Sequence, residues 1–384
     1  MTVTDVIFHR KTYADQMAQQ LIQPLPLQMN VRSGVFLSGI RRVGKTTFLR
    51  QDLVPALEAL GALVIYVDLW ADRSKNPATL VLDAVRSTLQ QLQTPGSGLL
   101  QRFKGLNLGA AGFSFGFQLD SLGTTGGTTL AQAFAELVAK AKVNVVLIVD
   151  EVQQALGTED GSSLLHALKA ARDAVNSKPG TPGYFLFLGT GSHKSLITDM
   201  ATKHSQPFTG ALTTAYELLA LDFVQWQLAR IANTPGVVVP SVALAWAGFQ
   251  TMGHRPEELL KALVQLQTAP APADQAFPII CATLASVAAD IELRAIEEFG
   301  DLGQAVFARI AQGSESGVAG LFGEEALATY AELTGAPVPT SQVQNLVERM
   351  ISANLIARPG HGTYIVADPF VRKVWLDRQK LLPL

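Results

Sequence analysis

The sequence predicts an α/β protein built on a parallel sheet, followed by a smaller helical part. Over residues 35–221, short apolar runs alternate with longer helical stretches such as TTFLRQDLVPALEAL and SLLHALKAARDAV. Strands that are apolar throughout, each followed by a helix, indicate a parallel sheet covered on both faces. The candidate strands are VFLSG, LVIYVDL, VVLIVDE, YFLFLGTG and AYELLAL.

Length and composition exclude several classes of protein. The 384 residues are enough for two or three domains. No apolar run reaches the roughly 18 residues needed to cross a bilayer, and the N-terminal stretch lacks the apolar core of a secretory signal. Cys281 is the only cysteine, so neither an intrachain disulfide nor a cysteine-based zinc site is available. We therefore expect a cytoplasmic protein without a membrane partner.

Changes in residue pattern divide the chain into parts. We expect a core over residues 1–221, a helical lid over 222–267, a linker over 268–278 and a C-terminal domain over 279–384. The linker prediction rests on the prolines of TAPAPADQAFP. A glycine-rich stretch, about residues 105–129, interrupts the core pattern and predicts an inserted strand pair or a mobile loop. Its role is open, with structural padding favoured over a functional arm.

The end of the chain has the pattern of a winged helix. A helix is expected around Glu324 to Leu333, a turn at GAPVP, a second helix from near Thr340, and a strand pair NLIAR and TYIVA joined by PGHG. The polar positions of the second helix suit DNA bases; they are Ser341, Gln342, Gln344, Asn345 and Arg349. Positive and negative residues cancel in this domain, however, and the net charge of the chain is −2, so DNA and protein partners are left equally open.

One short segment carries a specific phosphate-binding pattern. Residues 39–46, GIRRVGKT, fit G-x-x-x-x-G-K-[ST] between a predicted strand and a predicted helix. Glycines let successive backbone N–H groups point at phosphate oxygens, and the helix adds its positive N-terminal end. We expect Lys45 to bind the β- and γ-phosphates and Thr46 to bind Mg²⁺. The predicted nucleotide-binding residues of the loop are Gly39, Ile40, Arg41, Arg42, Val43, Gly44, Lys45, Thr46 and Thr47.

Two later strands supply the groups that hydrolysis requires. The run VNVVLIVDEV ends in Asp150, a candidate for holding Mg²⁺, and Glu151, a candidate base that accepts a proton from water. The run YFLFLGTGSH ends in the polar residues Thr190, Ser192 and His193, and Thr190 or Ser192 could sense the γ-phosphate. A plain helix cap is the alternative role for these hydroxyls.

Together, GIRRVGKTT, LIVDEVQQAL, LGTGSH and MGHRPEELL resemble the archaeal-type ATPase family of the AAA+ P-loop ATPases. The resemblance rests on the paired arginines, on Gly191 and Ser192, and more loosely on Gly253 and Pro256. It implies a P-loop NTPase with a five-stranded parallel sheet, in which the sensor strand lies between the two nucleotide motifs, and a helical lid.

The resemblance also implies roles for residues outside these motifs. Arg255 would contact the γ-phosphate from the lid, and residues 8–13 would lie near the adenine. The family often has an arginine where this chain has Ala211, which leaves the arginine finger unassigned. The candidates for that finger are Arg172, Lys194 and Lys203.

These observations predict an Mg²⁺-dependent ATPase of the AAA+ type that couples its nucleotide state to a winged-helix output domain. DNA transactions such as those of mobile elements or defence systems fit this prediction, with ATP, protein partners and further copies of the chain as its other partners. The alternative is a slowly hydrolysing switch or scaffold that acts through protein partners. A DNA-binding regulator with a degenerate nucleotide site is less favoured, because Lys45, Asp150 and Glu151 are all present.

Overall fold

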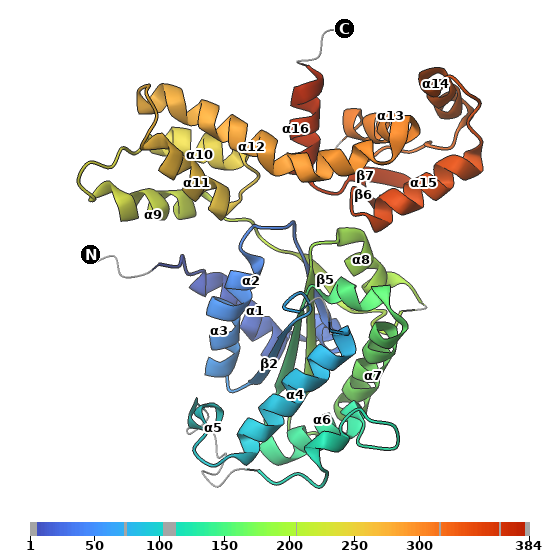
Figure 1. The fold of residues 1–384 in the computed structure, drawn as a ribbon. Helices are drawn as coiled ribbons and strands as arrows, with labels where there is room; N and C mark the ends of the chain where they lie inside the picture. Colours follow the sequence, from blue (N-terminus) through green and yellow to red (C-terminus); the bar gives the residue numbers. More distant parts are fainter. Residues whose placement is uncertain are drawn as a thin grey trace. The chain divides into compact units, whose positions relative to one another are not determined.

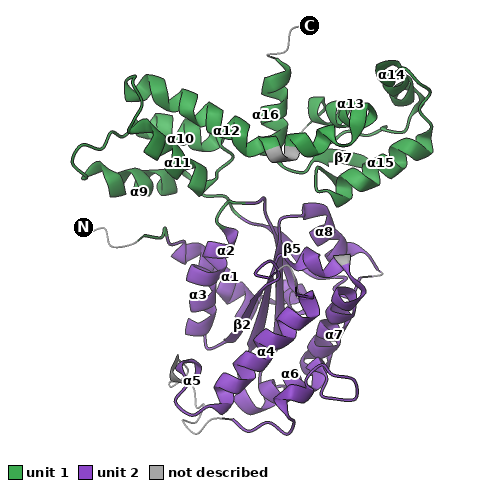
Figure 2. Cartoon of the chain, viewed as in Figure 1, with its two compact units in different colours: residues 1–8, 42–44, 217–384 green, residues 9–41, 45–216 purple. Residues whose placement is uncertain are grey.

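The computed structural model describes residues 6–72, 75–102, 113–204, 206–314, 316–360 and 362–380. The chain forms two compact units, coloured separately in Figure 2. The sheet unit comprises residues 9–41 and 45–216, and the helical unit comprises residues 1–8, 42–44 and 217–384. None of the helices in the described ranges is long and apolar enough to span a membrane.

The sheet unit contains a five-stranded sheet in the order β2-β3-β4-β1-β5, and every neighbouring pair is parallel. This confirms the predicted parallel sheet, with β4 between the strands that lead into the two nucleotide motifs. The strands are β1 (Val35–Ser38), β2 (Leu63–Asp68), β3 (Val145–Asp150), β4 (Phe185–Gly191) and β5 (Leu212–Ala215).

Helices cover both faces of this sheet (Figure 1). On one face lie α4 (Pro77–Gln93), α6 (Leu130–Ala141), α7 (Glu159–Asn176) and α8 (Lys194–Thr202). On the other lie α1 (Lys11–Ile22), α2 (Lys45–Phe48) and α3 (Val54–Ala59). Alternate residues of each strand face opposite helix layers, so central strands are buried throughout and need apolar side chains at every position.

The remaining short segments of the sheet unit are helical turns. They are η1 (Pro26–Ser33), α5 (Gly98–Arg102), η3 (Leu119–Ser121) and η4 (Val152–Gly157), together with a π-helical turn, η2 (Leu49–Leu53), between α2 and α3. Pro55 follows that turn and has no N–H to donate to the carbonyl of Gln51, which accounts for a local widening of the helix at this place.

One prediction about the sheet unit is wrong, and one of the two alternatives for the glycine-rich stretch, a strand pair, is not seen in its described residues. The fifth strand is LTTA, residues 212–215, and not the apolar run AYELLAL that follows it. This strand lies at the edge of the sheet, and its residues alternate between half-buried and exposed. A strand with this exposure can be formed by threonines and needs no continuous apolar run, so a search for apolar runs selected the wrong segment. In the glycine-rich stretch, the described residues 113–129 contain no strand, and residues 105–112 lie outside the described part.

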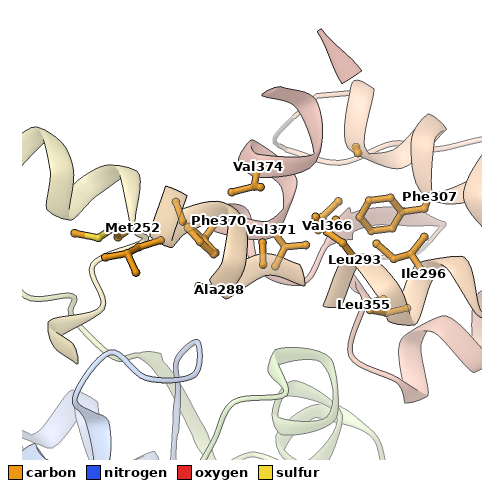
Figure 3. Close-up of a cluster of buried hydrophobic side chains, with 14 of the residues drawn as sticks. Met252, Ala288, Leu293, Ile296, Phe307, Leu355, Val366, Phe370, Val371 and Val374 are labelled. Carbon is orange, nitrogen blue, oxygen red and sulfur yellow. The ribbon is translucent and has the colours of Figure 1, made fainter. Parts of the chain in front are cut away.

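The helical unit is built around one hydrophobic core that joins the predicted lid to the predicted winged helix (Figure 3). Met252 of the lid, Ala288 of the long helix and Phe370 of the last helix belong to this core. Its elements are α9 (Leu221–Ala232), α10 (Val242–Thr251), α11 (Pro256–Leu266), α12 (Ala273–Glu297), α13 (Gly300–Gln312), α14 (Glu324–Thr334), α15 (Thr340–Ser352), β6 (Ile356–Gly360), β7 (Thr363–Val366) and α16 (Pro369–Gln379).

The predicted linker is wrong from Ala273 onward, because helix α12 begins there and contains Pro278. A proline near a helix start sacrifices only one backbone hydrogen bond. Burial of Phe277 and Cys281 on either side of it offsets that loss. The winged-helix elements are found where they were expected, with helices α14 and α15 followed by the antiparallel pair β6 and β7.

Candidate nucleotide site

The loop between β1 and α2 has the backbone of a phosphate cradle. Arg42 and Gly44 have left-handed φ angles of 65° and 89°, which bend the chain sharply before α2. Gly39 donates its N–H to the carbonyl of Gly191 at 3.0 Å, and a Cβ on Gly39 would lie 2.8 Å from Cβ of Tyr216. Glycine is therefore required where the loop leaves the sheet.

Side chains of the loop differ in exposure. Arg41, Arg42, Thr46 and Thr47 are exposed, and Ile40 is half-buried. Val43 is buried. Lys45 is also buried, and its Nζ donates to the carbonyl of Gly39 at 3.3 Å, across the loop. A cation held over the cradle in this way is placed to meet phosphate oxygens.

Asp150 is the centre of a hydrogen-bond cluster at the carboxyl edge of the sheet. Thr46 donates its hydroxyl to Asp150 Oδ2 at 2.6 Å, although 104 residues separate the two in the chain. Thr190 donates to Asp150 Oδ1, and the N–H of Glu151 donates to the same oxygen at 3.1 Å. The two predicted Mg²⁺-binding oxygens are therefore adjacent, as a hydroxyl–carboxylate pair suited to a hard cation requires.

Strand β2 adds two residues to this cluster that the sequence analysis missed. Tyr66 donates its hydroxyl to Asp150 Oδ2 at 3.1 Å, and Asp68 lies opposite Asp150 in the paired strands. Burial raises the pKa of the Tyr66 hydroxyl, and the carboxylates of Asp150 and Asp68 raise it further. Burial also raises the pKa of Asp68, and the negative charges of Asp150 and Glu151 raise it further. The hydrogen bond from the Trp70 N–H lowers this pKa, but its effect is smaller than that of burial. The signal was the run LVIYVDL, whose last residue but one, Asp68, is acidic.

Glu151 lies beside the loop lysine but is held by other groups. Its Oε1 is 3.9 Å from Lys45 Nζ. Its Oε2 accepts from the Ser192 hydroxyl at 3.1 Å and from the Gln153 amide. The backbone of Glu151 is left-handed, with φ 55°, which turns the chain away from β3 immediately after Asp150. Gln153, three residues beyond the end of β3, was not singled out by the sequence.

The two sensor candidates have different partners. Thr190 is fully buried and contacts Asp150, whereas Ser192 contacts Glu151. Arg41 donates from Nε to the Ser192 hydroxyl at 3.3 Å, and its guanidinium lies 4.8 Å from the centre of the Trp70 ring. One arginine of the loop is thus linked to the end of the sensor strand.

Arg255 has a partner within the helical unit. It is only 2% exposed, donates to Asp368 Oδ2 at 2.9 Å and lies 4.0 Å from the centre of the Phe370 ring. Its Nε is buried without a hydrogen-bond partner among the described residues. The contact of Arg255 with a γ-phosphate stays a prediction.

The other predicted residues have ordinary surroundings. In the segment expected near the adenine, Tyr13 stacks on Phe48 of α2 with ring centres 4.8 Å apart, and His9 pairs with Asp52 at 2.6 Å. Among the arginine-finger candidates, Arg172 bonds to Asp173 and to the carbonyl of Ser33, Lys203 pairs with Asp199, and Lys194 is an exposed residue at the start of α8.

A parallel sheet with this loop after β1, an Asp-Glu pair after β3 and a polar tip on the strand between them defines a P-loop ATPase. Residues 26–179 match the model of a family described as an ATPase domain predominantly from Archaea. No curated protein matches the chain.

Solved structures share the fold over nearly the whole chain. The ADP form of the Aeropyrum pernix ORC2 protein is 14% identical, covers 97% of this chain with 94% of its own length, and has a TM-score of 0.56. The ADPNP-ADP complexes of the same protein are 15% identical, cover 98% of each chain and have a TM-score of 0.53. At this identity the likeness shows the architecture, a P-loop ATPase core followed by a lid and a winged helix.

Proposed function

We propose that this protein binds ATP together with Mg²⁺, hydrolyses it, and uses the nucleotide state to move its helical unit. One observation carries the proposal: Thr46 and Asp150 are joined at 2.6 Å while Lys45 lies 3.9 Å from Glu151. A phosphate-binding cation, a pair of metal-binding oxygens and a candidate base are thereby gathered at one edge of the sheet. The ADP and ADPNP complexes named for the ORC2 structures support an adenine nucleotide as the ligand.

Each residue has a distinct task in this proposal. The loop amides and Lys45 bind the phosphates, since backbone N–H groups and an ammonium suit spread negative charge. Thr46 and Asp150 hold Mg²⁺, which when bound neutralises charge on the phosphates. Glu151 accepts the proton of the attacking water, and Tyr66 and Thr190 keep the Asp150 carboxylate in place.

In this proposal, the helical unit is the part of the protein that moves when the nucleotide state changes. Its lid helices and its winged helix share one hydrophobic core, so a displacement of the lid carries the winged helix with it. The pair of Arg255 and Asp368 reinforces this connection between α11 and α16. A rigid connection of this kind converts a small change at a nucleotide into a movement of an output domain.

The target of the winged helix is proposed to be DNA or a protein. On α15 the side chains of Gln342, Gln344, Asn345 and Arg349 are exposed and suit base edges. Two basic residues of α16 are engaged inside the fold, because Arg372 donates to the carbonyls of Ala311 and Gly313, and Arg378 bonds to Asp290. The remaining positive charge is modest, which favours weak, salt-sensitive DNA binding over tight binding.

A slowly hydrolysing switch is the second candidate, and the contacts of Glu151 with Ser192 and Gln153 favour it. A base engaged in this way suits a protein that stays loaded with ATP. ATP turnover measured with and without duplex DNA separates the candidates. Strong stimulation by DNA supports the motor, whereas tight ATP binding with little turnover in both conditions supports the switch.

The central experiment compares ATP binding and ATP cleavage in the wild type, Glu151→Gln and the exposed control Glu159→Gln. We expect Glu151→Gln to bind ATP like the wild type and to cleave it at least about 100 times more slowly, because the amide cannot accept the proton. Glu159→Gln should behave like the wild type. Normal cleavage by Glu151→Gln would show that another group is the base, and no ATP binding by the wild type would refute the function.

A further inference from the structure

The turn between α1 and β1 exposes three large apolar side chains, which we call the apolar tip. Leu27 is 99% exposed, and Leu25 and Met29 on either side of it are 64% and 50% exposed. Pro24 and Pro26 flank Leu25 and fix φ at both positions, so the conformation of this turn is restricted before any partner binds. Single exposed apolar residues are ordinary, but a cluster such as this one marks an interaction site.

A hollow of about 130 Å³ is lined by residues of the same turn, of α1, of β1 and of β5. Buried or half-buried apolar residues such as Leu21, Val31 and Leu212 line it, together with the exposed amides of Gln16 and Gln20. Small-molecule sites usually measure about 300–1,000 Å³, so this hollow is too small for a metabolite. An apolar space of about 150 Å³ takes a group the size of benzene, so the hollow matches one large apolar side chain.

The surface that carries the apolar tip and the hollow is uncharged. Residues 16–31 and 211–216 contain no charged residue, although charged residues make up 16% of the chain. Arg32 follows the first of these ranges, and its guanidinium is held 3.5 Å from the centre of the Tyr184 ring. A surface of one charge repels its own copy, whereas an uncharged surface with amide groups meets its own copy without that cost.

We propose that this surface joins two copies of the chain, with Leu27 of each copy inserted into the hollow of the other. Turn η1 carries Leu27 and also supplies Val31 to the wall of the hollow, so both features belong to one patch. A two-fold axis through such a patch forms both contacts at once and closes the assembly as a dimer. A large side chain in a fitted pocket is the kind of contact that dominates the affinity of an interface.

This interface is separate from the nucleotide site. The hollow is lined by Val35, the first residue of β1, whereas the phosphate loop follows Ser38, the last residue of that strand. Dimer formation through the apolar tip therefore requires no nucleotide, and the proposal goes beyond the proposed function without depending on it.

The test measures the mass of the full chain by sedimentation velocity, without nucleotide, over about 1–100 μM, the range in which a small interface assembles. We expect a reversible monomer–dimer equilibrium for the wild type. In Leu27→Ser the dissociation constant should rise at least about 100-fold, because each dimer loses two anchors. Leu260→Ser, at an exposed leucine of α11, is the matched control and should dimerise like the wild type. Lys45→Ala should also dimerise normally, since the nucleotide site takes no part.

A second variant tests the hollow. Gln20→Trp places a large ring at an exposed position of the lining, where it should block the hollow and weaken dimer formation as Leu27→Ser does. A mixture of the two variants should dimerise about tenfold more tightly than either variant alone, because the mixed pair keeps one intact leucine and one intact hollow. Two misfolded proteins could not restore each other in this way, so recovery in the mixture separates interface contacts from loss of structure.

Three results would overturn the proposal. They are a wild type that stays monomeric over the whole range, a dimer that survives Leu27→Ser or is lost in Lys45→Ala, and a mixture without recovery. Binding of a monomeric wild type to vesicles of anionic phospholipid, abolished by Leu27→Ser, would assign the apolar tip to a membrane surface and overturn it as well. None of these measurements depends on ATP cleavage, so the proposed function is tested separately.

Discussion

Arg255 and Asp368 form a largely buried ion pair, 2.9 Å from nitrogen to oxygen, that joins the start of α11 to the start of α16. The same carboxylate accepts from the N–H of Phe370 and caps α16, while the Phe370 ring lies against the guanidinium. An ion pair, a helix cap and a cation–ring contact thus occur together where the lid is connected to the winged helix within the helical unit.

Removing one member of this pair should destabilise the helical unit. Arg255→Leu leaves the largely buried carboxylate of Asp368 without its partner, and we expect a loss of about 3 kcal/mol in the free energy of unfolding. Chemical denaturation measures this loss. Restoring charge balance in Arg255→Leu/Asp368→Asn should recover part of it. Lys380→Met, which breaks an exposed pair with Asp377 in the same helix, should cost under about 0.5 kcal/mol, and an equal cost for both would contradict the assignment.

Gly253 should tolerate no side chain, for two separate reasons. Its φ of 72° is left-handed, and a Cβ there would lie 2.8 Å from the Phe370 ring. Gly236 has a φ of 79° but open space around the same position among the described residues. Backbone strain alone should lower the free energy of unfolding of Gly236→Ala by about 1 kcal/mol. In Gly253→Ala the clash with Phe370 adds to this strain, and the total loss should be about 3 kcal/mol. Similar melting temperatures for the two variants would show that α16 does not pack on this turn.

Tyr66 should support magnesium binding through Asp150. Tyr66→Phe removes the hydroxyl that donates to Asp150 Oδ2 and keeps the ring. We expect the Mg²⁺ concentration for half-maximal ATPase activity to rise about 10- to 100-fold, since a hydrogen bond to a charged group contributes about 1.5–3 kcal/mol and orients the metal ligand. Titration of activity with Mg²⁺ at saturating ATP measures the change. An unaltered titration curve would mean that Thr46 and Thr190 suffice to hold the carboxylate.

Lys45 should govern nucleotide affinity. Lys45→Ala removes the ammonium that lies across the loop, and we expect the ATP dissociation constant to rise at least about 100-fold, because the lost contacts are charge-assisted. Fluorescence of a labelled ATP analogue gives the affinity directly. Lys140→Ala, which changes an exposed lysine at the end of α6, serves as the control and should bind ATP normally.

Cys281 should be inert in the folded protein. Burial raises the pKa of its thiol from 9.0 to about 12, and the side chain is 1% exposed. At pH 8 a maleimide should label the thiol only after unfolding, because the reactive thiolate is neither formed nor accessible. Rapid labelling of the native protein would show that α12 opens easily.

The same pKa shift predicts how stability depends on pH. The contribution of the neutral Cys281 thiol is fully present below pH 9 and is lost as the pH rises from about 9 towards about 12, since the unfolded chain releases the proton first. The stability difference between the wild type and Cys281→Ala should therefore narrow above pH 9. Denaturation of both proteins at pH 8 and pH 10 measures this difference.

Local chemistry made much of the protein predictable. The loop from Gly39 to Thr46 needs particular residue types at fixed spacing, and central strands must be apolar at every position, so both are visible in the sequence. The edge strand β5 was misplaced because it is only half-buried, and the start of α12 was missed because tertiary burial outweighs one lost hydrogen bond at Pro278.

By itself, the sequence determined the fold class, the phosphate loop, the pair Asp150 and Glu151, and the polar tip of β4, because each depends on residues that are close together in the chain. Only the tertiary structure decided which distant side chains meet these groups: Tyr66 at Asp150, Gln153 and Ser192 at Glu151, and Asp368 at Arg255. The physical reason is that such contacts depend on how helices and strands pack, and packing is set by the summed burial of many apolar residues and by no single motif.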